Sequence, residues 1–238
     1  LEEGKEIGYQ GFELGNKFPK EKEALKAKLG EYGFECVSGW YSSFLAHGTV
    51  EEEIDRVSAH LDKLLYNGSN VMVYGECAGT IQGDRSKALY MRPKFTSDAQ
   101  WQAYAEKVTK FGDWLLARGM RLAYHHHMGA YVETPEDVDM LMKLTGESVG
   151  LLFDTGHMTF AGGDALTELK KHINRVCHFH CKDVRSDIIK LARNRNWAFL
   201  DSVLNGAFTV PGDGAINFAP ILQTLAENGY KGWLVVEA

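Results

Sequence analysis

Cysteine is scarce in this sequence and does not form a disulfide framework. Four cysteines occur in 238 residues, at Cys36, Cys77, Cys177 and Cys181, and no two of them form a CxxC pair. A chain stapled by disulfides needs a denser pattern than this. We therefore expect reduced thiols, most of them buried.

Long hydrophobic runs and clusters of basic residues are also absent. No apolar run approaches the roughly 18 residues that cross a bilayer, and the first residues, LEEGKEIG, are charged where a signal peptide would be basic and then apolar. The net charge is −6, with 26 Lys and Arg against 32 Asp and Glu, and the chain has no basic cluster for a phosphate backbone. We expect a cytoplasmic protein that binds neither membrane nor nucleic acid.

No low-complexity stretch or Pro/Gly/Ser-rich linker divides the chain, and 45% of its residues are hydrophobic, enough for a large core. Short β-rich segments alternate with helical segments throughout. The pattern predicts seven strands, at residues 11–15, 35–41, 71–77, 122–128, 149–155, 176–183 and 232–238.

Helix punctuation separates these strands. Predicted helices cover 20–29, ending at Gly30, then 50–67 after a Thr49 cap, 98–118, a segment from Pro135 to Gly146 capped by Thr134, and 218–228. Repeated strand–helix units imply parallel strands with right-handed crossovers, in either a doubly wound sheet or a (β/α)8 barrel. Polar residues at the ends of many different strands favour the barrel.

We therefore predict one α/β domain over residues 1–238, a (β/α)8 TIM barrel. Seven strands are countable, the first residues read as a helix, and the last residues read as a strand with no covering helix. The expectation is that strand one and the last helix of the barrel are missing from this chain.

Six of the nine histidines lie at the ends of three predicted neighbouring strands. Alternation along LAYHHHM directs His125 and His127 to one face and His126 to the other. In VCHFHCKD, the same rule places His178 and His180 inside the barrel, opposite Cys177, Phe179 and Cys181, which suit the helix-covered side.

Two imidazoles and two carboxylates from four strand ends make a candidate metal site, formed by His125, Asp154, His180 and Glu237. Mixed nitrogen and oxygen ligation without thiolate fits Mn, Co, Fe or Zn, and the imidazoles disfavour Mg or Ca. The alternative is a set of buried polar groups that hydrogen-bond one another. Burying so many ionisable groups without a metal is costly, which favours the metal site.

Other polar residues near the strand ends are candidates for substrate contact or support of the metal site. The parity of His126 predicts a structural role, and His178, deeper in the barrel, is expected to support a ligand. Glu13 either contributes to the pocket or hydrogen-bonds within the barrel. The candidates for catalysis or substrate contact are His127, His157, Lys182, Asp183, Arg185, Asn16, Lys17 and Trp40.

The PGDGAINF stretch, residues 211–218, has the glycines of a phosphate-binding loop. An acid between its glycines is a poor neighbour for a phosphate, however. We interpret it as a tight turn before a helix.

Several motifs in order along the chain, FDTGH, HFHCKD, PGDGAINF and a final WLVVEA, resemble the xylose-isomerase-like barrels of the sugar phosphate isomerase/epimerase superfamily. The combination of GNKFP, LAYHHHMG, FHCKDVR and FTVPGDG is similar to its inosose dehydratases, and the resemblance covers nearly the whole chain. It implies a dehydratase of inositol catabolism that converts 2-keto-myo-inositol to a trihydroxycyclohexane-dione. It also implies a divalent metal, Mn²⁺ or Co²⁺ with Zn²⁺ as a further option, and a role for glutathione.

Superfamily metal sites use a Glu, an Asp, a His and a Glu on successive strand ends. By resemblance, Asp154, His180 and Glu237 match the last three, and His157 is the substrate-side histidine, but His125 stands where isomerases and epimerases carry the first Glu. A reversible epimerase uses two bases on opposite faces of a carbon. Losing one carboxylate therefore fits a one-directional elimination better.

The implied reaction removes a proton beside a ketone and expels a hydroxyl from the next carbon. Glu237 is the first candidate base, with His157 or His127 as alternatives, and Lys182 or a protonated imidazole would assist departure of the hydroxyl. The competing hypotheses are a sugar isomerase or epimerase, a DNA-repair endonuclease of the related barrel, and a non-catalytic sugar-binding module. We expect a small cyclic polyol ketone as partner and a homo-oligomer as assembly.

Overall fold

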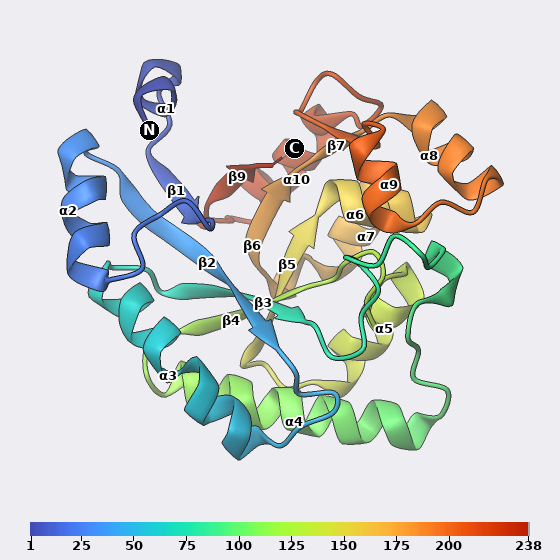
Figure 1. The fold of residues 1–238 in the computed structure, drawn as a ribbon, viewed down its shortest axis with the longest axis horizontal. Coiled ribbons are helices and arrows are strands. Elements are labelled where there is room, and N and C mark those ends of the chain that lie inside the picture. The colour runs from blue at the N-terminus through green and yellow to red at the C-terminus, as the bar shows by residue number, and fades with distance from the viewer. Residues whose placement is uncertain (238) are drawn as a thin grey trace.

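The computed structural model describes residues 1–237 and contains a single seven-stranded parallel sheet that curves into a nearly closed barrel (Figure 1). The neighbour order is β1-β2-β3-β4-β5-β6-β9, so each strand pairs with the next one in the sheet along the chain. The strands are β1 (Gly11–Leu14), β2 (Glu35–Ser43), β3 (Val71–Glu76), β4 (Arg121–His125), β5 (Val149–Asp154), β6 (Val176–Cys181) and β9 (Leu234–Val236).

Helices cover the outside of this sheet, as the strand–helix alternation predicts. They are α1 (Glu2–Ile7), α2 (Lys22–Tyr32), α3 (Val50–Tyr66), α4 (Asp98–Leu116), α5 (Pro135–Leu144), α6 (Thr155–Ala161), α7 (Ala165–His172) and α10 (Phe218–Glu227), with short 3-10 turns at Leu89–Met91 and Ile173–Arg175. The main core lies between strands and helices, and includes Leu25, Leu64, Phe111, Leu151 and Phe179. None of the helices in the described part is long and apolar enough to cross a membrane.

A cap segment, residues 182–217, follows β6 and lies over one end of the barrel (Figure 1). It contains β7 (Asp183–Val184), α8 (Ser186–Asn194), α9 (Phe199–Leu204) and β8 (Phe208–Thr209), and β7 pairs with β8 in antiparallel fashion. Its apolar side chains form a second small core with residues of the barrel loops: Met128, Phe160, Val184, Ile189, Ala192, Phe199, Ala207 and Phe208. The sequence pattern did not predict these elements.

Two local predictions are wrong. Helix α2, predicted to end at Gly30, continues through Gly30 to Tyr32. It ends at Gly33, whose φ of +73° suits glycine. Cys177 does not face the helices: the pairing of β5 with β6 shifts between Leu151 and Leu152, and Cys177 packs with the small cluster inside the barrel. A β-bulge places two successive side chains on one face, which breaks the alternation used for the prediction.

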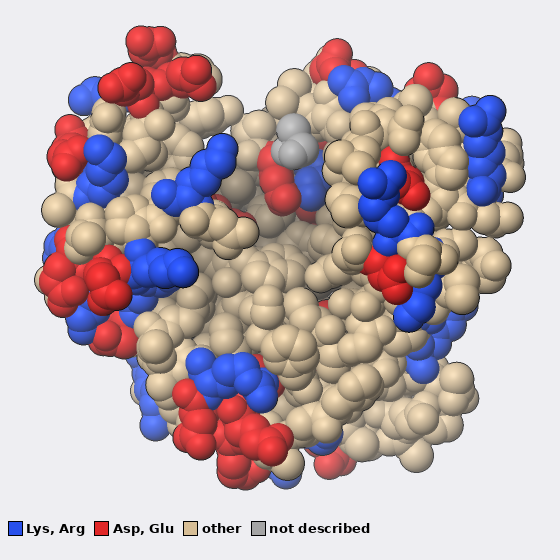
Figure 2. Space-filling model, in the orientation of Figure 1, with Lys and Arg blue, Asp and Glu red and all other residues tan. Residues whose placement is uncertain are grey.

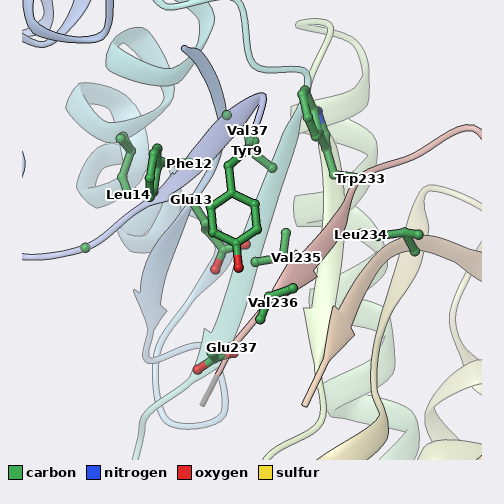
Figure 3. Close-up of a pocket in the computed structure, with 12 residues that line it drawn as sticks. Tyr9, Phe12, Glu13, Leu14, Val37, Trp233, Leu234, Val235, Val236 and Glu237 are labelled. Carbon is green, nitrogen blue, oxygen red and sulfur yellow. The ribbon is translucent and has the colours of Figure 1, made fainter. Parts of the chain in front are cut away.

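The sheet is open between β1 and β9, which do not pair with each other. A cavity of about 310 Å³ occupies this gap, lined by residues of both strands, including Glu13 and Glu237 (Figure 3). All four cysteines are free thiols, with Cys36 and Cys181 buried and Cys77 and Cys177 partly buried.

Candidate active site

Four predicted metal ligands converge at the carboxyl ends of β4, β5, β6 and β9. Oδ2 of Asp154 lies 3.5 Å from Nε2 of His125 and 3.4 Å from Nδ1 of His180. Nδ1 of His180 lies 2.7 Å from Oε2 of Glu237. Parallel register explains the meeting, because Asp154 pairs directly with His180 and adjacent strand ends reach the same mouth.

The unpaired atoms of this group fit a divalent cation. Oδ2 of Asp154, Nδ1 of His180 and Oε2 of Glu237 are buried and have no hydrogen-bond partner, although they lie within 3.5 Å of one another in two pairs. Acceptors that converge without a proton between them are costly, and a cation that takes their lone pairs removes that cost. One atom from each of His125, Asp154, His180 and Glu237 lies within 4.8 Å of the others, as a metal site requires.

Lys182 brings a positive charge to the same carboxylates. Its Nζ lies 3.4 Å from Oδ2 of Asp154 and 3.1 Å from Oε1 of Glu237, and its side chain is 5% exposed. Burial opposes the ionisation of both Asp154 and Glu237. Lys182 nevertheless holds the pKa of Asp154 well below its usual range. His180 and Lys182 together lower the pKa of Glu237 to about 2. Glu237 is therefore a weak base in this arrangement.

Glu13 supports the histidines of β6 from across the barrel. Its Oε2 accepts hydrogen bonds from Nε2 of His178, at 2.8 Å, and of His180, at 3.1 Å. The bond to Nε2 leaves Nδ1 of His180 facing Asp154 and Glu237. Figure 3 shows Glu13 beside the gap between β1 and β9. The structure shows both alternatives left open by the sequence, because Glu13 lines the cavity and also hydrogen-bonds within the barrel.

His127 and His157 pack against each other beside the ligand group, with ring centroids 4.0 Å apart and the planes tilted by 39°. Both contact the main chain of Met128: Nδ1 of His127 lies 2.8 Å from its carbonyl oxygen, and its N–H donates to Nδ1 of His157 at 3.1 Å. Burial lowers the pKa of His127 to about 3 and that of His157 well below its usual value. Both imidazoles are therefore neutral near pH 7.

Aromatic rings surround this histidine pair. Trp40 contacts His125 and His127 with centroids 5.6 and 5.9 Å away, and Phe199 lies 5.0 Å from His127. Phe208 lies 4.9 Å from His157 and receives the ammonium of Lys182 over its ring at 4.8 Å. Sequence reasoning missed Phe199 and Phe208, since they belong to the unpredicted cap.

His126 has the structural position that its parity predicts. It is fully buried, packs edge-on against Phe153 and accepts the backbone N–H of Asp154 at 3.2 Å. That bond fixes the strand end that carries Asp154. The Oδ1 atom of Asp154 in turn accepts the N–H of His157 at 2.8 Å, which caps α6.

Three predicted substrate contacts are not brought to the ligand group. Asn16 and Lys17 lie exposed in the turn after β1. Arg185 is engaged by the cap itself, where its guanidinium donates to Oγ1 of Thr209 at 2.9 Å and to Oδ2 of Asp213 at 2.6 Å. Arg185 is thus held by hydrogen bonds within the cap. Trp40 and Lys182, in contrast, lie at the site.

Asp183 fills the centre of the PGDG loop with its own side chain. Its buried carboxylate accepts the N–H groups of Val184, Gly212, Gly214 and Ile216 at 2.8 to 3.1 Å. The loop therefore does form an anion-binding nest, and a carboxylate of the chain itself fills it. The interpretation as a structural turn is consistent with these bonds.

Charged residues do not gather into a patch of one sign around the hollow centre of the face in Figure 2. Lysine and arginine side chains alternate there with aspartate and glutamate. A nucleic-acid backbone needs a basic surface along its path. The face in Figure 2 shows no such surface around its hollow.

The family model for the xylose isomerase-like TIM barrel matches residues 1–238. The chain belongs to this family. Two curated members resemble it closely. The rhizopine catabolism protein MocC of Rhizobium meliloti is 45% identical over 239 residues, covering 100% of this chain and 73% of that protein. An inosose dehydratase of Clostridium botulinum is 42% identical, covering 97% of this chain and 78% of that protein.

Among solved structures, this xylose isomerase-like barrel is similar to the probable 3-DHS dehydratase AsbF of Bacillus anthracis. The TM-score is 0.73 at 14% sequence identity, and the match covers 99% of this chain and 84% of that one. At this identity the similarity supports the barrel fold. The fold and family predicted from the sequence are confirmed.

Proposed function

We propose that this chain is a metal-dependent dehydratase that eliminates water from 2-keto-myo-inositol and yields a trihydroxycyclohexane-dione. The observation that carries the proposal is the convergence of the unpaired donor atoms of Asp154, His180 and Glu237 with His125 at one barrel mouth. Relatives at 40–42% identity named inosose dehydratase support the choice of substrate.

His125, Asp154, His180 and Glu237 would hold the ion, with Mn²⁺ or Co²⁺ as the proposed metal and Zn²⁺ as a further option. A divalent ion bound there supplies Lewis acidity toward a ketone and its neighbouring hydroxyl. The donor set fits because it contains two imidazoles and two carboxylates and no thiolate.

The chain's own residues would bind the ring and move the protons. Trp40, Phe199 and Phe208 offer flat apolar faces to the C–H side of a cyclic polyol. Oε1 of Glu237 lies 3.1 Å from Nζ of Lys182, and its Oε2 would be a ligand of the ion, so we assign proton abstraction to the pair of His127 and His157. The buried ammonium of Lys182 would protonate the leaving hydroxyl.

The test uses protein stripped of metal with a chelator and reloaded with Mn²⁺, Co²⁺ or Zn²⁺, with and without glutathione. Incubation with 2-keto-myo-inositol should produce the ultraviolet absorbance of the conjugated, enolised dione only after reloading. Asp154→Asn should lose both metal and activity, while Glu51→Gln, at an exposed position of α3, should keep both. Interconversion of ketoses without that absorbance would instead support a sugar isomerase or epimerase.

Two further parts of the proposal concern the cell. We place the protein in the cytoplasm and expect a homo-oligomer. Fractionation of cells and light scattering of the purified chain test them directly.

A further inference from the structure

The main chain of one residue, Met128, contacts both histidines beside the metal ligands. A carbonyl oxygen can only accept a hydrogen bond, so Nδ1 of His127, 2.8 Å from that oxygen, must carry a proton. A backbone N–H can only donate, so Nδ1 of His157, 3.1 Å from that nitrogen, must be bare. Because an imidazole carries at least one proton, Nε2 of His157 has a hydrogen, and in a His127 ring with a single proton, held at Nδ1, Nε2 has a lone pair.

The loop that carries Met128 is held firmly, so this choice of tautomers is built into the fold. The side chain of Met128 is buried in the cap core. The N–H of the next residue, Gly129, donates to Oε2 of Glu133 at 2.6 Å, and the Glu133 carboxylate lies 3.3 Å from Nε of Arg92. Gly129 has a φ of +81°, which a side chain would strain.

The surroundings of the two Nε2 atoms agree with these proton positions. Nε2 of His157 is buried and has no hydrogen-bond partner, so it is a donor without an acceptor. His127 is only partly buried, and its Nε2 forms no hydrogen bond within the described residues. The ring centroids lie 4.0 Å apart, so the two imidazoles are direct neighbours.

We propose that Met128 divides the proton chemistry between these histidines, so that Nε2 of His127 is the base that removes the substrate α-proton and Nε2–H of His157 is the donor to the ketone oxygen. This inference rests on the proposed dehydration and assigns its roles. A neutral imidazole that donates to a carbonyl oxygen is an established catalytic device in another barrel enzyme.

The steps balance without an additional reactant. His127 takes the α-proton, the C–H electron pair becomes the C=C bond of the enolate, and the ketone oxygen gains charge that the His157 N–H stabilises. The electron pair then expels the β-hydroxyl, which takes a proton from Lys182 and leaves as water. Solvent returns the proton on His127 to the neutral amine of Lys182.

The tautomers are measured directly, without turnover. Long-range proton–nitrogen correlation spectra of protein labelled with ¹⁵N-histidine should show a protonated Nδ1 and a bare Nε2 for His127, and the reverse for His157. His127→Phe, His157→Phe and His47→Phe, the last on another surface, assign the signals. The same tautomer in both rings, or the opposite assignment, would overturn the proposal.

The roles are separated by glutamine variants, because a side-chain amide donates a hydrogen bond but does not act as a base. His157→Gln should recover much of the turnover lost in His157→Phe, where loss of the donor costs about 10²–10³-fold in kcat. His127→Gln should be no better than His127→Phe, both losing about 10²–10⁴-fold.

Exchange of the substrate α-proton in deuterated water distinguishes this inference from the proposed dehydration. Lys182→Gln should keep the exchange while losing elimination, and adding His127→Phe should stop the exchange. Exchange that survives His127→Phe would overturn the base assignment. Wild-type protein with the expected tautomers and α-proton exchange, but with no elimination under any metal, would contradict the dehydration and support the division of roles.

Discussion

Glu13 acts through another side chain, the imidazole of His180. It accepts the Nε2–H of His180 at 3.1 Å, on the ring edge opposite Asp154 and Glu237. A carboxylate behind a ligating histidine fixes its tautomer and orientation and increases its basicity. Glu13 and His180 form such a pair if Nδ1 of His180 is the ligand atom.

Replacing Glu13 by Gln should therefore weaken metal binding about 10–100-fold. Both imidazole N–H groups donate to Oε2 of Glu13, and an uncharged amide oxygen in its place would accept them more weakly than the carboxylate does. The measurement is competition for Co²⁺ against a chromogenic chelator, with thermal melting of the metal-free protein as the check on folding.

The matched variant Glu13→Asp keeps the charge and should lose less affinity. An unchanged dissociation constant in Glu13→Gln would contradict the role. Since Glu13, His178 and His180 also lie within 4.8 Å of one another, the same titration counts ions per chain, and two ions would show that Glu13 is itself a ligand.

At the scale of elements, the packing of β2 on β3 sets the position of Trp40. An added Cβ at Gly75 would lie 2.1 Å from the Trp40 ring, so only glycine lets the indole lie flat over β3. The Nε1 atom of Trp40 donates to Oγ of Ser42 at 2.9 Å, which fixes the ring beside His125 and His127.

Gly75→Ala should displace Trp40 and lower kcat/KM at least about tenfold, because a shift of about 1 Å in a positioning group can cost 10²-fold. The change should appear as a shift in tryptophan fluorescence. Gly83→Ala is the control, because an added Cβ there meets no atom within 4 Å. A fluorescence shift with unaltered kinetics would show that Trp40 does not position the substrate.

The elements differ in how far the sequence could predict them. Helix α3 was readable because Thr49 and Glu52 form a capping box before an amphipathic segment, and both signals are local. The inward orientation of Cys177 could not be predicted, because a bulge depends on the register of two paired strands. Helix α9 is six residues long and is stabilised by distant partners such as Met128, so its pattern is weak.

For the whole molecule, a buried carboxylate between the sheet and its covering helices predicts a pH dependence of stability. Burial raises the pKa of Glu76 to about 7, even though its oxygens accept from the N–H groups of Ala46 and Ala78 and from two tyrosines. An acid whose pKa rises on folding binds more protons folded than unfolded. Its contribution is complete below about pH 4.5 and is lost as the pH rises through 7.

The free energy of unfolding of the wild type relative to Glu76→Gln should therefore fall by about 3 kcal/mol between pH 4.5 and pH 8. Urea denaturation across this range measures it. Glu52→Gln is the control of opposite sign, because hydrogen bonds from Thr49 lower the pKa of Glu52. A difference for Glu76→Gln that is constant with pH would contradict the assignment.

The site as a whole could be predicted where its residues are consecutive on strand ends. His125, Asp154, His180 and Glu237 follow directly from the barrel topology, which brings parallel strand ends together. The pairing of Glu13 with His178 joins residues 165 positions apart, and no local signal encodes it. The same holds for Phe208, whose contact with His157 depends on the fold of the cap.

The gap between β1 and β9 has a consequence for how firmly the fourth ligand is held. Glu237 follows a strand of three residues that pairs only with β6 in the described part of the chain, whereas β4, β5 and β6 each have two neighbours. Transient opening of an edge is easier than opening of the centre. A metal ion that binds only the closed strand should therefore slow hydrogen exchange at the amides of Val235, Val236 and Glu237, while β4 and β5 should change little. Measured residue by residue, that contrast would show that the ion stabilises the end of β9 in this chain.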